Sequence, residues 1–186
     1  MDASLLVLAG GLDRKAWLPV GNSILLRCVA QSLAAAFSEV LASFVEPEQL
    51  EQPVPYRVVF DRRILGGPLA GLEAGLTAAR HEIVFAVGCD MPYITPSFAE
   101  LAVAAARTAD AAIPRPSSGP AKVCGAYRRT ALPAVSRALD AGHSNTEWVV
   151  EQIEVTWLEG QDPDQFPTVT PPDELGRLHA ALSSQR

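Results

Sequence analysis

Short apolar runs alternate with longer segments of helical periodicity along this chain of 186 residues. The short runs are predicted to form strands covered on both faces, because such strands lack the regular polar alternation of exposed ones. They lie at residues 5–8, 39–45, 56–60, 82–87, 111–113, 122–127 and 154–158. The periodic segments predict helices at residues 24–37, 68–79, 96–107, 130–141, 146–152 and 171–182. This alternation predicts βαβ crossovers, and therefore a three-layer α/β sandwich with a mostly parallel sheet in one domain spanning residues 1–186.

Two of the predicted helices carry clear start signals. Pro68 and Pro96 stand at their first turns, where the missing N–H has no intrahelical partner to lose and the fixed φ is already helical. Thr95 precedes the second of these prolines and is expected to cap the helix with its side-chain oxygen.

Composition and charge narrow the class of protein. Hydrophobic residues make up 48% of the chain and the net charge is -6, which favours a globular fold and argues against nonspecific binding to nucleic acid or a membrane surface. No apolar run approaches the length of a membrane span, and no basic segment of a signal peptide precedes the first strand. Cys28, Cys89 and Cys124 show no metal-ligand spacing, so we expect buried thiols in a reducing, cytoplasmic environment.

Two lone carboxylates follow apolar strands, and they are the strongest candidates for chemistry. Asp61 and Asp90 each stand at a strand end, and ligands of open parallel sheets bind beyond the carboxyl ends of the strands. Asp90 is either a ligand for Mg²⁺, which binds one or two carboxylates together with substrate phosphates, or a cap for the turn that follows. Asp61 is expected to hydrogen-bond a base or ribose, to lie near the metal, or to cap a turn.

Glycine and lysine positions add to this prediction. Gly10 and Gly11 follow the first strand, where glycine lets backbone N–H groups approach a phosphate. Arg14 and Lys15 come next and are expected to neutralise phosphate charge, and Lys15 is one of only two lysines in the chain.

Two glycines, Gly71 and Gly75, share one face of the predicted helix at 68–79 because they lie four residues apart. A helix pays about 1 kcal/mol for each glycine relative to alanine, so the close approach of another group is expected to offset this. That group is either a bound base and ribose or the backbone of the sheet.

With these motifs in place, the chain resembles the molybdenum cofactor guanylyltransferases, the MobA-like nucleotidyltransferases that attach GMP to molybdopterin. The resemblance covers roughly residues 4–180. Its most specific part is the ordered pair Gly-Pro-Leu-Ala-Gly at 67–71 and Cys-Asp-Met-Pro at 89–92. The other matching pieces are Leu-Ala-Gly-Gly at 8–11, Lys15 with Leu-Pro-Val-Gly at 18–21, Asp61, Tyr-Arg-Arg at 127–129 and Leu-Pro at 132–133.

The resemblance implies a Rossmann-like fold and a GTP site. It implies a catalytic role for Lys15, which would contact the phosphates, and for Asp90, which would also hold Mg²⁺ as cofactor. The other residues that it implies for nucleotide binding are Leu8, Ala9, Gly10, Gly11, Ser43 and Asp61. Ser43 stands where family members often have asparagine.

The implied reaction is attack of a molybdopterin phosphate on the α-phosphorus of GTP, with release of pyrophosphate. Such a transfer depends on positioning and electrostatics and needs no covalent protein nucleophile. The resemblance also implies GTP and molybdopterin as partners, together with proteins that mature molybdoenzymes.

The chain departs from the family at three places. Only three residues separate Gly11 from Lys15, where the family has a longer segment; Ala121-Lys122 replaces a Gln-Pro; and residues 168–172 replace an Asn-x-Asn-Thr-Pro stretch. A shorter phosphate loop offers fewer N–H donors. Two alternatives to guanylyl transfer therefore stay open, namely a non-catalytic cofactor-binding or assembly factor and a related nucleotidyltransferase that uses CTP.

Overall fold

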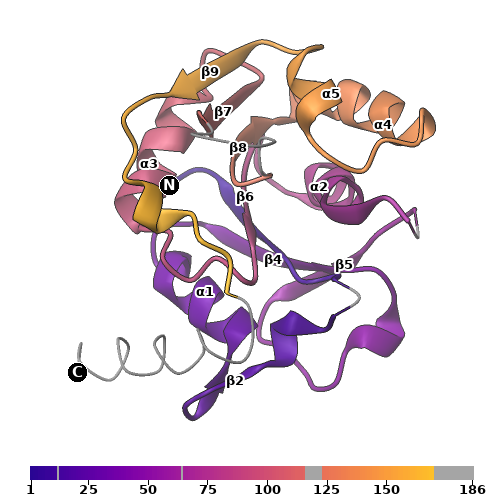
Figure 1. Cartoon of the computed structure of the whole chain (residues 1–186), viewed down its shortest axis with the longest axis vertical. Helices are drawn as coiled ribbons and strands as arrows, with labels where there is room; N and C mark the ends of the chain where they lie inside the picture. Colours follow the sequence, from indigo (N-terminus) through magenta and orange to yellow (C-terminus); the bar gives the residue numbers. More distant parts are fainter. Residues whose placement is uncertain (12, 64, 116–122, 170–186) are drawn as a thin grey trace.

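A seven-stranded sheet forms the centre of the computed structural model, which describes residues 1–11, 13–63, 65–115 and 123–169 (Figure 1). The strand order across the sheet is β5-β4-β1-β6-β8-β7-β9. In chain order, the strands are β1 Ser4–Leu8, β4 Glu39–Phe44, β5 Arg57–Phe60, β6 Ile83–Gly88, β7 Ala111–Pro114, β8 Gly125–Arg128 and β9 Val155–Leu158. All seven coincide with the predicted apolar runs; β8 begins later than predicted, and residue 122 lies outside the described residues.

Most neighbouring strands run parallel, as predicted. β1 pairs in parallel with both β4 and β6, and only β8 runs antiparallel to its neighbours β6 and β7. The register places Leu8 of β1 opposite Ser43 of β4 and Gly88 of β6. The loops that follow these strands therefore leave the sheet at the same level and meet at one edge.

Five α-helices cover the two faces of the sheet in the described part of the chain. They are α1 Leu25–Ala34, α2 Gly67–Ala78, α3 Pro96–Ala105, α4 Leu132–Asp140 and α5 Glu147–Val150. The predicted cap is confirmed, because the Thr95 hydroxyl accepts a hydrogen bond of 3.2 Å from the N–H of Phe98. The helix predicted at residues 171–182 lies outside the described residues.

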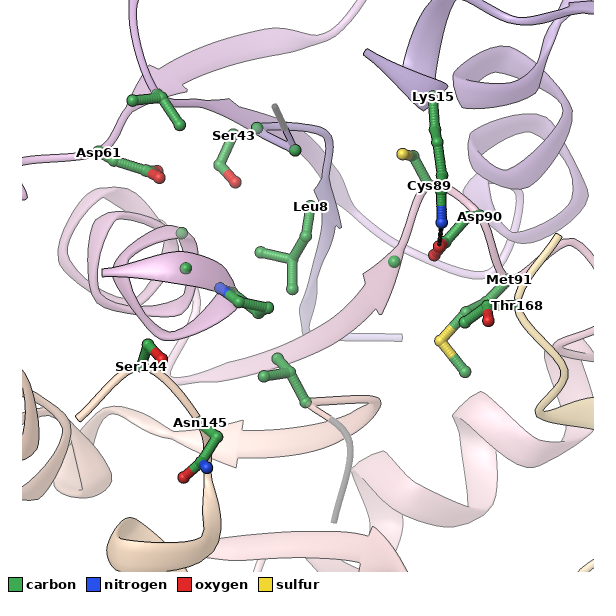
Figure 2. Close-up of a pocket in the computed structure, with 18 of the residues that line it drawn as sticks. Leu8, Lys15, Ser43, Asp61, Cys89, Asp90, Met91, Ser144, Asn145 and Thr168 are labelled. Atoms are coloured by element: carbon green, nitrogen blue, oxygen red, sulfur yellow. Dashed lines mark hydrogen bonds and ion pairs between the residues drawn. The ribbon is translucent and has the colours of Figure 1, made fainter. Parts of the chain in front are cut away.

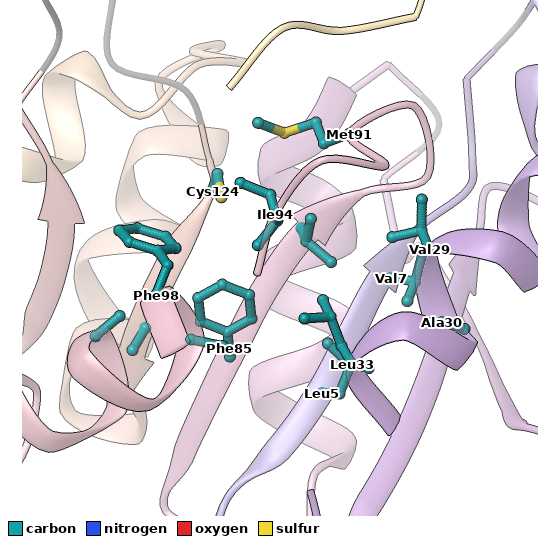
Figure 3. Packing of buried hydrophobic residues seen from close by; sticks show 14 of the residues in the cluster. Leu5, Val7, Val29, Ala30, Leu33, Phe85, Met91, Ile94, Phe98 and Cys124 are labelled. Atoms are coloured by element: carbon teal, nitrogen blue, oxygen red, sulfur yellow. The ribbon is translucent and has the colours of Figure 1, made fainter. Parts of the chain in front are cut away.

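Alternating residues of the central strands supply both halves of the core. Leu5 of β1 points to the face covered by α1 and α3, where it joins a cluster that includes Leu33, Phe85 and Phe98 (Figure 3). Leu6 points to the opposite face and packs in a second cluster with Leu72 and other residues of α2 and α4. Because both faces are buried, these strands are apolar throughout, which explains the runs that predicted them.

Two small elements between β1 and α1 were not predicted. A 3₁₀ turn spans Lys15–Trp17, and a two-stranded hairpin pairs β2 (Pro19–Val20) with β3 (Ser23–Ile24) around Gly21, whose φ of 58° favours glycine. No helix within the described ranges is long and apolar enough to cross a membrane.

Candidate active site

A cavity of about 650 Å³ opens at the carboxyl ends of the parallel strands (Figure 2). Most of the residues predicted for the site line it, although they are spread over more than eighty positions of the chain. These are Leu8, Gly10, Gly11, Lys15, Ser43, Asp61 and Asp90. Ala9 is the exception: it is buried, and its N–H donates to the Ser43 carbonyl at 2.9 Å, so it holds β1 against β4 behind the cavity wall.

Lys15 and Asp90 form an ion pair at one end of this cavity. Lys15 Nζ lies 2.9 Å from Asp90 Oδ2 and 3.5 Å from Asp13 Oδ2, and the Lys15 and Asp90 side chains are about one-fifth exposed. Partial burial lowers the pKa of Lys15, but the hydrogen bond and charge of Asp90, helped by Asp13, outweigh this and raise it. The ammonium is therefore charged at neutral pH and faces the cavity, as a phosphate ligand requires.

Backbone hydrogen bonds from three parts of the chain hold the turn that carries Asp90. The N–H of Cys89 donates to the Leu8 carbonyl at 3.0 Å, and the N–H of Met91 donates to the Gly88 carbonyl at 3.1 Å. The N–H of Val169 donates to the carbonyl of Asp90 itself at 2.7 Å. The Asp90 carboxylate is thus fixed by the sheet and by the segment that follows β9.

Asp61 lies across the cavity from this ion pair (Figure 2). Its N–H donates to the Phe44 carbonyl at 2.9 Å, which places the side chain at the end of β5. Its Oδ1 atom is buried and has no hydrogen-bond partner in the described part of the protein. Burial, and secondly the charge of Glu73, raise the pKa of Asp61 to about 7. A buried acceptor without a partner is costly unless a ligand supplies a donor.

The two glycines of α2 have different neighbours. A Cβ at Gly71 would lie 2.6 Å from Ser43 Oγ and 2.8 Å from Leu8 Cδ2, at the cavity wall. A Cβ at Gly75 would collide with the Leu6 side chain inside the core. Both glycines therefore permit close packing of the helix on the sheet, Gly71 at the cavity wall and Gly75 inside the core. The bound base and ribose that the sequence offered as the alternative for this face stays a prediction.

Gln49 supports the loop that contains Gly10 and Gly11 through hydrogen bonds, and the sequence analysis did not identify this residue. This buried side chain accepts a hydrogen bond of 2.8 Å from the Val45 N–H and donates one of 3.5 Å to the Gly10 carbonyl. Trp17 Nε1 in turn donates to the Gln49 carbonyl at 2.7 Å. No local sequence pattern indicates that a single glutamine in an irregular segment is buried and supports a neighbouring loop.

Arg14 does not line the cavity, although the sequence suggested it for charge neutralisation. It adopts a left-handed conformation with φ 53°, and its guanidinium lies 3.1 Å from Glu51 Oε1 at the surface. Among the described lining residues, Lys15 is the only cation. A phosphate bound in this cavity would therefore contact one cationic side chain, Lys15, among the described lining residues.

Two further parts of the cavity lining were not selected as site residues from the sequence. Ser144, Asn145 and Thr146 follow α4 and lie on one side, whereas Thr168 lies beside Asp90 and Met91 (Figure 2). A Cβ at Gly67 would lie 3.2 Å from the Ser144 carbonyl oxygen, so this segment packs closely on the start of α2. Its approach depends on tertiary packing, for which the sequence carries no local signal.

The donor set suits a metal that arrives with its ligand. Within the described ranges, no group of three or more His, Cys, Asp or Glu side chains could hold a metal ion. Asp90 contributes one carboxylate at the cavity wall. Mg²⁺ would fit such a wall, because it keeps several waters and binds through one or two carboxylates plus substrate phosphates.

The fold is that of an open α/β sheet with a cavity at its carboxyl edge, where proteins of this architecture bind their ligands. Residues 5–165 match the model of the MobA-like NTP transferase domain. The chain therefore belongs to the MobA-like NTP transferase family.

Individual relatives agree with this assignment. A protein of Pelotomaculum thermopropionicum named "Probable molybdenum cofactor guanylyltransferase" is 34% identical over 147 residues, covering 76% of this chain and 71% of that protein. A protein of the same name from Methanosarcina mazei is 31% identical over 180 residues, covering 88% and 80%. The crystal structure of molybdopterin-guanine dinucleotide biosynthesis protein A from Archaeoglobus fulgidus superposes with a TM-score of 0.82 at 19% identity, covering 97% and 99%, and shows the shared fold.

Proposed function

We propose that this protein transfers GMP from GTP to molybdopterin, forming the guanine dinucleotide cofactor and releasing pyrophosphate. The names of its relatives support this reaction. The observation that carries the proposal is the arrangement of the cavity. The Lys15–Asp90 ion pair lies at one end, and at the other lies Asp61, whose buried Oδ1 atom has no hydrogen-bond partner among the described residues.

The ion pair defines the phosphate end of the proposed site. The Lys15 ammonium would bind the triphosphate and stabilise charge that develops on the transferred phosphoryl group. Asp90 would hold Mg²⁺, which supplies Lewis-acid stabilisation of that charge when it is bound. Because the two side chains pair with each other in the free protein, both are already positioned at the cavity wall before the nucleotide arrives.

Asp61 defines the base end. An ionised carboxylate only accepts hydrogen bonds. Guanine presents two adjacent donors, N1–H and the 2-amino group, whereas cytosine and adenine alternate a donor with an acceptor on the same edge. The Asp61 carboxylate therefore favours GTP over CTP and ATP, and Gly71 leaves room for the base beside Leu8 and Ser43.

No protein nucleophile is needed for the transfer. The acceptor phosphate attacks the α-phosphorus of GTP in line, and the bond to the bridging oxygen of the pyrophosphate breaks. The protein's contribution is to position both substrates and to stabilise the charge. Of the polar lining residues, Thr168 beside Asp90 would border the acceptor.

Calorimetric titration with GTP tests this proposal. We expect GTP to bind in the presence of Mg²⁺ and to bind less tightly without it, with CTP and ATP at least about tenfold weaker. The variant Asp90→Asn should lose the Mg²⁺ effect, whereas Glu100→Gln on the exposed side of α3 should retain it. Equal binding of the three nucleotides would contradict the guanine assignment, and no binding of any would favour a non-catalytic factor.

A further inference from the structure

Two arginines follow Asp61 directly: Arg62 is exposed, and Arg63 is turned toward other acids. Arg63 lies only two residues after Asp61, yet no ion pair joins them among the described residues. Instead, Arg63 Nε lies 3.2 Å from Glu73 Oε2 in α2, and its terminal nitrogen lies 2.5 Å from Asp140 Oδ1 at the end of α4. Two acids on two helices thus hold one cation.

Glu73 is a buried acid that contacts both Arg63 and Ser136. Its side chain is only 7% exposed, and the Ser136 hydroxyl of α4 donates to its Oε1 atom at 2.6 Å. A buried carboxylate is stable only when it is paired and hydrogen-bonded, and here Arg63 and Ser136 meet both needs. The network also ties α2 to α4 and to the loop after β5, which borders the cavity.

Because Arg63 is held elsewhere, it leaves the Asp61 carboxyl open to other partners. An arginine that is free to move commonly forms a bidentate pair with a neighbouring carboxylate. Such a pair would occupy the acceptor atoms that a base needs. The observed Asp61 Oδ1 atom is buried without any partner in the described part of the chain.

We propose that Glu73 and Asp140 are positioning residues that hold Arg63 away from Asp61 and so keep the Asp61 carboxylate free to bind the guanine base. This inference rests on the proposed function, because it assumes that Asp61 contacts the nucleotide base. When the two acids are neutralised, Arg63 turns to Asp61 and competes with the base.

A set of variants tests this inference by GTP affinity. The comparison is made at pH 9, where Asp61 is ionised with or without the charge of Glu73. In the double variant Glu73→Gln with Asp140→Asn, we expect the Kd for GTP to rise about three- to fivefold, the size expected of a competing, partly exposed ion pair. Adding Arg63→Met, which keeps the apolar stem and removes the charge, should restore the Kd to within about twofold of the parent. In an Asp61→Asn background, the same double substitution should leave the Kd unchanged.

Glu39 provides a matched control at the other end of the sheet. It is also a buried acid, with Arg57 at 3.1 Å and the Ser4 hydroxyl at 2.7 Å. Glu39→Gln should lower the melting temperature without changing the Kd for GTP. If the double variant at Glu73 and Asp140 does not fold, Asp140→Asn alone should raise the Kd about twofold, because that side chain is 65% exposed and its removal spares the core.

Two outcomes would overturn the inference. One is a loss of affinity that Arg63→Met does not reverse, and the other is the same loss in the Asp61→Asn background, since each would show general damage to the fold. If the unsubstituted protein binds GTP but makes no dinucleotide, the proposed function is refuted, while the positioning role of Glu73 and Asp140 still stands. A parent that does not bind GTP would overturn both.

Discussion

Replacement of Asp61 by asparagine should make the protein more stable and bind GTP less tightly at the same time. The carboxyl sits in a partly buried position where its ionised form is disfavoured, first by burial and then by the charge of Glu73. Asparagine has nearly the same shape and carries no charge. The substitution therefore removes the cost of the charge together with the acceptor that the base requires.

The magnitude follows from the pKa of Asp61, which rises from 3.8 to about 7 on folding. Such a rise corresponds to roughly 4 kcal/mol against the ionised form, and partial solvent contact in the cavity reduces this to about 1–2 kcal/mol. The pKa of Asp61 in the folded protein lies above its unfolded value, so the protonated carboxyl is favoured by folding. The stability of the folded protein is therefore full below pH 4, and this free energy is lost as the pH rises through about 7. Asp61→Asn should therefore add about 1–2 kcal/mol at pH 8 and almost nothing at pH 4.

Thermal unfolding and calorimetry measure the two effects. At pH 8, the melting temperature of Asp61→Asn should exceed that of the parent by about 2–8 °C, and the difference should shrink as the pH falls. The Kd for GTP should rise about 10- to 100-fold, the size expected when charge-assisted hydrogen bonds are lost. In the parent, GTP affinity should increase between about pH 6 and pH 8 as Asp61 ionises. An equal or lower melting temperature at pH 8, or a gain independent of pH, would refute the reasoning.

Further substitutions probe the rest of the cavity. Lys15→Met should slow pyrophosphate release by at least about 100-fold, because it removes the cation closest to the proposed phosphate position. Asp90→Ala should abolish Mg²⁺-dependent transfer, and a variant that still forms the dinucleotide would exclude Asp90 as the metal ligand. Gly71→Ala should raise the Kd for GTP about tenfold by narrowing the cavity wall. Its matched control, Gly75→Ala, should instead lower stability by about 1–2 kcal/mol through contact with Leu6, with the Kd unchanged.

The fold was predictable from the sequence because its central strands are buried on both faces. A strand such as β6 is apolar along its whole length, and the topology rules for alternating strands and helices then place Asp61 and Asp90 at the same edge of the sheet. The short hairpin and the 3₁₀ turn were not predicted, since two- and three-residue elements are too short to show a period.

Contacts across the chain were beyond local patterns. Lys15 and Asp90 are 75 positions apart, and nothing near either residue indicates that their side chains meet. Arg14 and Lys15 are adjacent cations, yet the left-handed backbone at Arg14 sends one guanidinium to Glu51 and leaves the ammonium in the cavity. The positions of these side chains depend on how distant segments pack, and the sequence shows only the residue types.

The most direct test of the central claim is formation of the dinucleotide by the purified protein. GTP, Mg²⁺ and molybdopterin are incubated with it, and the products are followed by mass spectrometry together with pyrophosphate release. We expect one molybdopterin guanine dinucleotide for each pyrophosphate released, with CTP giving far less product. Preferential use of CTP, or GTP binding with no dinucleotide formed, would contradict guanylyl transfer as the function of this protein.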